Sequence, residues 1–238
     1  MLSDIRTEHG HAGHGVAPPS SLDNAAARIL LQRAQGALQK WPEGFPGFRA
    51  DLTVTLDGRA RAGSALIGPR GEVEVALADE AARDWARALL GEVVAERMPR
   101  FFKDGDGRFP IAFEPSPDAP GADGLGPRLV VHRGAHGMPP VRYRIDERAR
   151  LRECERVEGV HRRVETYESF CRATPGRILP ARRSTVVYDA HGLVRTELVE
   201  DTHLRVSHTW LPATRWMQTS RLDTTVVREA RFDAHTLL

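Results

Sequence analysis

The amino-acid sequence predicts an α+β fold, in which a large, strongly curved antiparallel sheet of half-barrel shape carries two main helices packed on one face. Residues 48–56 alternate apolar and polar side chains without a fault, which is typical of a half-buried strand. Two segments repeat apolar residues at helical spacing, and residues 141–230 read as one strand after another. We assign residues 21–238 to this single domain and expect residues 1–20, which are rich in His, Gly and Pro, to be flexible.

The first predicted helix runs from about residue 24 to Lys40. Ser21, Asp23 and Asn24 each offer a side-chain oxygen for the free N–H groups of a first helical turn. Apolar residues at helical spacing give the segment one apolar stripe: Leu30, Ala34, Ala37 and Trp41. Prolines and glycines within residues 42–47 end the helix.

Three strands are expected next, joined by tight turns. Asp57-Gly58 tolerates positive φ, so it connects the alternating strand 48–56 to a second strand running back. Residues 68–71, Gly-Pro-Arg-Gly, turn the chain again into a third strand at 72–77. These segments indicate an antiparallel sheet.

A second helix is predicted from Asp79, a plausible N-cap, to the residue before Pro99. One side of this helix is almost wholly apolar and is expected to be buried: Ala82, Trp85, Ala86, Leu89 and Val93, followed by Glu96. The pair Phe101-Phe102 and residues 108–113 are expected to return to the sheet. Residues 114–127, which are rich in Pro and Gly, are expected to form a long loop, either a lid or a tolerated insertion.

The rest of the chain predicts an antiparallel meander. Residues 128–132 form a short apolar strand, and turn signals then divide the segment 141–230: residues 146–147, 158–159, 174–176, 189–192 and Pro212. Several of these strands carry charged side chains on both faces, residues 160–171 above all. A curled sheet with a partly polar concave side that holds a ligand would explain this pattern. Solvated outer faces covered by arginine stems are the alternative.

Composition limits the class of protein. The net charge of +2 argues against a nucleic-acid partner. The two cysteines, Cys154 and Cys171, lie on separate predicted strands; they exclude a disulfide framework but leave a single bridge open. We find no export signal and no apolar run long enough for a membrane span, so we expect a cytoplasmic protein.

Three segments resemble an uncharacterised bacterial family, known as domain-of-unknown-function family 3386: FPGFRADLTVTLDGRARAG, RVEGVHRRVETYESF and EDTHLRVSHTWLPATRW. The resemblance covers about residues 22–230. Its motifs are structural, so it implies no activity and no catalytic residue. The order of elements is also similar to the lipoprotein-carrier (LolA-like) architecture, in which a curved antiparallel sheet wraps helices and encloses a hydrophobic cavity for acyl chains. That second resemblance implies a fold and does not transfer function.

The histidines of the N-terminal segment form a candidate metal site. His9, His11 and His14 lie in a glycine-rich stretch, where three imidazoles can converge on Ni²⁺, Cu²⁺ or Zn²⁺. A solvated tail without function is the alternative, because a flexible segment loses conformational entropy when it coordinates a metal.

A second candidate site lies on the predicted meander. His161, Glu165 and Tyr167 share one face of a strand, and His203 joins them if the strand that carries it pairs alongside. These side chains would bind a ligand or, as a further alternative, perform acid–base chemistry.

We find no known catalytic motif. The preferred hypothesis is therefore a non-enzymatic protein that binds a small hydrophobic or amphipathic molecule. A metal-handling accessory protein and an enzyme are the alternatives.

Overall fold

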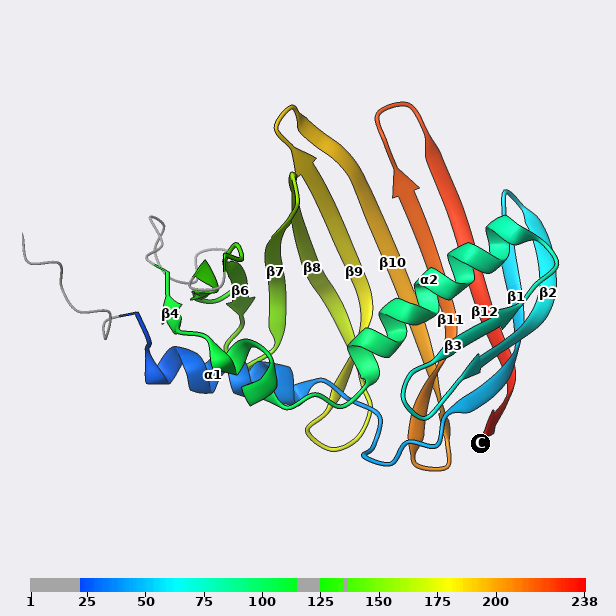
Figure 1. Ribbon diagram of the computed structural model, residues 1–238, viewed down its shortest axis with the longest axis horizontal. Helices are drawn as coiled ribbons and strands as arrows, with labels where there is room; N and C mark the ends of the chain where they lie inside the picture. Colours follow the sequence, from blue (N-terminus) through cyan, green and yellow to red (C-terminus); the bar gives the residue numbers. More distant parts are fainter. Residues whose placement is uncertain (1–21, 115–124, 135–136) are drawn as a thin grey trace, which may run out of the picture.

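The computed structural model of the protein describes residues 22–114, 125–134 and 137–238. Within these residues a 12-stranded open antiparallel sheet curves around one long helix (Figure 1). The strands in chain order are β1 (Phe48–Leu56), β2 (Arg59–Ile67), β3 (Val73–Ala76), β4 (Ile111–Phe113), β5 (Arg128–Val131), β6 (Val141–Ile145), β7 (Leu151–Glu158), β8 (His161–Arg172), β9 (Ile178–Asp189), β10 (Gly192–Val206), β11 (Thr209–Ser220) and β12 (Thr225–Leu237). The predicted fold class is confirmed.

The sheet is a meander in which the first strand of the chain, β1, pairs with the last, β12. Strands β4 to β12 follow one another as neighbours, and β12 then pairs with β1, which continues to β2 and the edge strand β3. Phe48 pairs with Leu237, close to the C-terminus. The first three strands therefore extend the sheet beyond its last strand.

Two helices lie on the concave face. Helix α1 (Ala25–Ala37) begins at Asn24, whose side chain accepts a hydrogen bond from the N–H of Ala27, and α2 (Glu80–Arg97) begins at Asp79, whose side chain accepts one from Ala82. Both N-caps were expected from the sequence. None of the helices in the described ranges is long and apolar enough to cross a membrane.

Each helix covers a different end of the sheet, so the core has two parts. Apolar residues of α2 pack with β1, β2, β3, β11 and β12, around side chains such as Phe48, Leu52 and Phe232. Helix α1 packs with β4 to β7, around side chains such as Leu31 and Ile145. The middle of the concave face, over β8 to β10, lies between the two helices.

The structure differs from the sequence prediction in two segments. The segment around Phe102 forms two 3-10 helices, Phe102–Asp104 and Asp106–Arg108, and only Ile111–Phe113 joins the sheet. The predicted turn at Pro212 is wrong: Pro212 lies inside β11, and the chain turns at residues 207–208. Most of the predicted loop 114–127 and all of the segment 1–20 lie outside the described residues.

Candidate ligand-binding site

The linker between α1 and β1 crosses the concave face and forms one wall of a pocket. The N–H of Gln39 donates to the carbonyl of Ile178 on β9, at 2.8 Å. Trp41 donates its N–H to the carbonyl of Arg97 at 2.7 Å and its indole Nε1 to the carbonyl of Trp210 at 3.0 Å. These bonds attach the linker to β9, α2 and β11, and so hold its side chains against the space between the helices.

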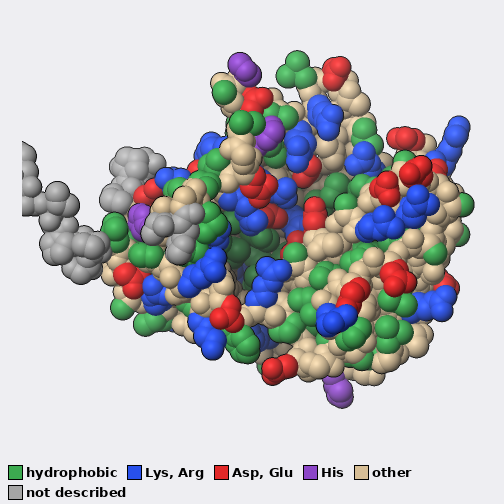
Figure 2. Space-filling model, viewed as in Figure 1, with side chains coloured by type: hydrophobic (Ala, Val, Ile, Leu, Met, Phe, Trp, Pro, Cys, Tyr) green, Lys and Arg blue, Asp and Glu red, His purple; other side chains and the backbone are tan. Residues whose placement is uncertain are grey.

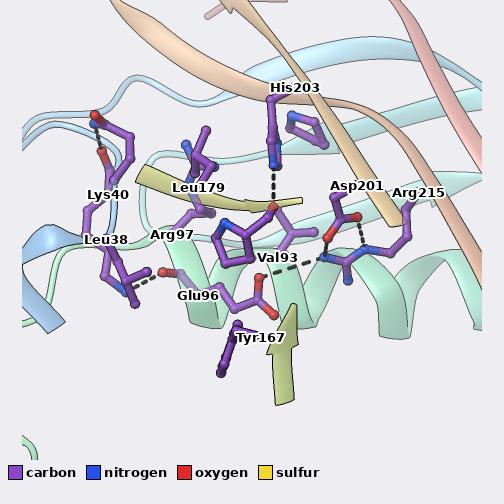
Figure 3. A pocket seen from close by; sticks show the side chains of 13 residues that line it. Leu38, Lys40, Val93, Glu96, Arg97, Tyr167, Leu179, Asp201, His203 and Arg215 are labelled. Atoms are coloured by element: carbon purple, nitrogen blue, oxygen red, sulfur yellow. Dashed lines mark hydrogen bonds and ion pairs between the residues drawn. The ribbon is translucent and has the colours of Figure 1, made fainter. Parts of the chain in front are cut away.

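This space, which we call the inner pocket, has a volume of about 110 Å³. It lies between the linker, the C-terminal half of α2 and strands β8 to β11 (Figure 3). Apolar groups form much of its wall: Leu38, Val93, Leu179, Pro180 and Pro212.

Irregular strand pairing shapes the floor of the inner pocket. The β10–β11 register shifts at His203, which pairs with Pro212, and the β8–β9 register shifts where Phe170 pairs with Pro180. Such shifts disrupt the ladder locally. The carbonyl of Pro180 instead accepts a hydrogen bond from His203 Nε2, at 3.1 Å, so this nitrogen carries the proton (Figure 3). Burial lowers the pKa of His203, which keeps the ring neutral at pH 7.

A wider hollow, which we call the outer chamber, adjoins the inner pocket and has a volume of about 430 Å³. The two spaces share Leu38, Lys40, Glu96 and Tyr167 in their walls. Figure 2 shows a hollow in the middle of this face, with acidic and basic side chains inside it. A molecule in the inner pocket would therefore contact apolar side chains and charged side chains together, with further charges in the adjoining outer chamber.

Two buried arginines form ion pairs that anchor α2 to the sheet beside the pocket. Arg215 of β11 binds Asp201 of β10 through two hydrogen bonds of 2.6 and 3.0 Å and lies 3.3 Å from Glu92 of α2. Arg183 of β9 forms a hydrogen bond with Glu96 of α2. Only 3% of the Arg215 side chain and 4% of the Arg183 side chain are exposed. These two arginines are buried, whereas 50% of the side chain of Arg162, in the segment 160–171 that prompted the alternative of solvated arginine-rich faces, is exposed.

The ion pairs determine the charge state of Glu96. Burial would raise the pKa of this carboxyl group, but Arg183 and Arg215 outweigh burial and lower the pKa to about 2. At Tyr167 the effect of burial prevails, and it raises the pKa of the phenol well above its usual value. At pH 7 the pocket thus holds an ionised Glu96 and a neutral Tyr167.

The structure brings together some of the residues predicted to bind a ligand. Tyr167 and His203 both line the inner pocket, and Glu165 lines the outer chamber with Tyr167. His161 lies at the β7–β8 hairpin and lines a separate small hollow. Strand β9 lies between β8 and β10, so the pairing that would place His203 beside His161 does not occur. Among the described residues, no hydrogen bond joins His161, Glu165 and Tyr167, as the acid–base alternative requires.

The predicted metal site at His9, His11 and His14 lies outside the described residues. Within the ranges that are described, no group of three or more His, Cys, Asp or Glu side chains is placed to hold a metal ion. Both cysteines are free, Cys154 buried on β7 and Cys171 partly buried on β8.

Sequence reasoning missed the cations that line the pocket. Lys40 and Arg97 line the inner pocket, and Arg183 and Arg215 hold its carboxylates. One signal was available: Lys40 is one of only two lysines in the chain, and it lies three residues after the end of α1. No periodicity could have identified the arginines, because arginine in a strand is usually exposed.

An open, curved antiparallel sheet with two helices on its concave face and a pocket beside the second helix defines the fold class of this protein. The chain belongs to the family described as protein of unknown function (DUF3386), whose model matches residues 22–238. This confirms the family resemblance noted in the sequence.

Among solved structures, a LolA superfamily protein from Nitrosomonas europaea is similar with a TM-score of 0.36 and 10% identity, over 89% of this chain and 93% of that one. A DUF1329 family protein from Desulfovibrio piger has a TM-score of 0.32 and 10% identity, over 89% and 92% of the two chains. No curated protein matches significantly. Function must therefore be inferred from this chain's own pocket.

Proposed function

We propose that this protein binds a small amphipathic molecule, whose apolar part contacts the apolar wall of the inner pocket and whose polar part contacts charged side chains of the same pocket. The observation that carries this proposal is the mixed wall of the inner pocket. Leu38, Val93 and Leu179 present apolar surface there, charged side chains complete the wall, and further charged side chains line the adjoining outer chamber. Ligand sites commonly combine apolar walls with a few polar groups that orient the ligand.

The volume of the inner pocket limits the size of the apolar part. An engineered apolar cavity of about 150 Å³ holds benzene. The inner pocket, at about 110 Å³, therefore accommodates an apolar group of roughly five carbon atoms. Burial of five such carbons supplies about 4 kcal/mol, which corresponds to a dissociation constant of about 1 mM.

Two probes of matched length test this proposal: hexanoate and hexanamide, titrated into ¹⁵N-labelled protein while the backbone amide shifts are measured. We expect saturable shifts at Leu38, Val93 and Leu179. In a Leu38→Trp variant, the indole fills the pocket and affinity falls at least ten-fold. The control is Leu193→Trp, because Leu193 is 52% exposed on β10 and lines neither space.

The outcomes are distinct. Saturable binding that Leu38→Trp abolishes and Leu193→Trp retains supports a ligand in the inner pocket. If neither probe shifts the pocket amides, or if Leu38→Trp binds both probes as the wild type does, the proposal is wrong. The amide spectrum of each variant away from the pocket shows whether its fold is intact.

A further inference from the structure

Two cations line the inner pocket without a carboxylate partner. Lys40 Nζ donates to the backbone carbonyl of Glu96 (Figure 3), and Arg97 Nη2 donates to the carbonyl of Trp210 at 2.8 Å. Among the described residues, neither cation lies within 4 Å of a carboxylate oxygen. Arg97 is only 5% exposed, and its Nε has no hydrogen-bond partner within the described part of the chain. Both side chains thus retain N–H donors that the protein does not use.

The surroundings make these charges costly. Burial lowers the pKa of Lys40; the negative charge of Glu96 opposes this effect in part, and the positive charges of Arg97 and Arg100 add smaller contributions in the same direction as burial. Burial likewise lowers the pKa of Arg97, to about 10. A buried charge is unfavourable unless it is paired, and among the described residues Glu96 acts on both cations without a carboxylate oxygen within 4 Å of either.

The carboxylates of the inner pocket do not pair with either cation. Asp201 is bound through both oxygens to Arg215, and Glu96 contacts Arg183 and Arg215. The acidic groups of the pocket are therefore held by cations of β9 and β11, while the cations on the linker and at the end of α2 remain available.

We propose that Lys40 and Arg97 bind the anionic group of the ligand, so that the ligand class is a small amphipathic oxyanion such as a short-chain carboxylate or phosphate ester. This inference rests on the proposed function, because the apolar part of the same molecule occupies the space beside Leu38 and Val93. Lysine and arginine are the side chains that form strong, charge-assisted hydrogen bonds with such oxyanions. Bound there, the oxyanion accepts the unused N–H donors and neutralises the buried charge.

The experiment compares hexanoate with hexanamide, which has nearly the same shape and no charge, by isothermal titration calorimetry at pH 7. We expect wild-type protein to bind hexanoate at least ten-fold more tightly than hexanamide. Lys40→Met retains an apolar stem and removes the charge, so the preference should fall to less than three-fold, and Lys40→Arg should restore it. The matched control is Lys103→Met, because Lys103 is the other lysine of the chain and is exposed.

Failure of this inference differs from failure of the proposed function. If wild-type protein binds both probes equally, the anion site is wrong while binding in the pocket stands. If neither binds, the proposed function fails, and the inference with it. Acetate and inorganic phosphate form a third arm: if they bind as tightly as hexanoate, the cations bind anions but the apolar wall contributes nothing, and the proposed function is wrong.

A second measurement observes Lys40 directly. Protein labelled with ¹³C at lysine Cε gives only two signals, and the Lys40→Arg variant assigns them. In free protein, Lys40 should titrate below 10.5, and saturating hexanoate should raise its pKa, because the bound carboxylate favours the ammonium form. If hexanoate shifts the pocket amides but leaves the Lys40 titration unchanged, the anionic group lies elsewhere and the inference is wrong.

Discussion

Replacing Arg215 by methionine should destabilise the protein more than any single change to its acidic partners. The guanidinium group of Arg215 is buried, binds both oxygens of Asp201, and lies 3.3 Å from Glu92 and 3.8 Å from Glu96. Methionine is similar in length and leaves Asp201, whose side chain is only 8% exposed, without its cation. Breaking a buried ion pair by removal of one partner costs about 3–5 kcal/mol.

Removing the negative charge of Asp201 is expected to reduce the free energy of unfolding by less than removing the positive charge of Arg215. In Asp201→Asn, the amide still accepts a hydrogen bond from Arg215, and Glu92 and Glu96 continue to balance the cation. We therefore expect a loss of about 1–2 kcal/mol. The double variant Arg215→Met/Asp201→Asn removes both charges of the closest pair. It should be less destabilised than the sum of the two single changes, because no unpaired aspartate remains.

Urea unfolding followed by far-UV circular dichroism at pH 7 measures these differences. The control is Arg70→Met, because Arg70 pairs with Glu72 at 2.7 Å but 88% of its side chain is exposed, so that the loss should lie within about 1 kcal/mol. If Arg215→Met costs less than about 1 kcal/mol, or no more than Asp201→Asn, then the buried pairs do not hold α2 to the sheet as we infer.

The remaining predictions concern pH and backbone space. Stability should fall as the pH drops from 4.5 towards 2, because Glu96 keeps a pKa of about 2 when folded while the unfolded chain takes up a proton near 4.5. Acid titration of the urea midpoint checks this, and Glu96→Gln should flatten the slope in that window. Gly91→Ala, in the interior of α2 with open space around the added Cβ, should stabilise by about 0.5–1 kcal/mol. Gly63→Ala should destabilise by about 1–3 kcal/mol, because the Cβ would lie 2.0 Å from the carbonyl oxygen of Ala76. Thermal unfolding distinguishes these variants. If both melt at the temperature of the wild type, both glycine predictions are wrong.

Local patterns determined the elements of this fold. The alternation along β1, the turn at Asp57-Gly58 and the N-caps Asn24 and Asp79 depend on residues only a few positions apart. Asp57 has the positive φ, 50°, that the turn prediction requires. Such features are readable from the sequence because the atoms that stabilise them belong to neighbouring residues.

The same local patterns misled at Pro212 and around Phe102. Proline and paired aromatic residues are typical of turns and strands respectively, but the shifted register of β10 with β11 accommodates Pro212 within a strand. Local preference was overridden there by pairing with a neighbouring strand. Polar residues misled in a similar way, because Arg183 and Arg215 look like surface residues until their partners on α2 are known.

Only the tertiary structure decided how the elements combine into a site. The pairing of β1 with β12 joins residues nearly the whole chain apart, and the linker reaches the pocket because α1 and β1 lie at different ends of the sheet. No period in the sequence encodes either contact. The sequence by itself thus determined an α+β protein with a curved antiparallel sheet and two capped helices. That Lys40 and Arg97 line the same pocket, on which the proposed ligand chemistry depends, results from long-range packing that local residue patterns do not specify.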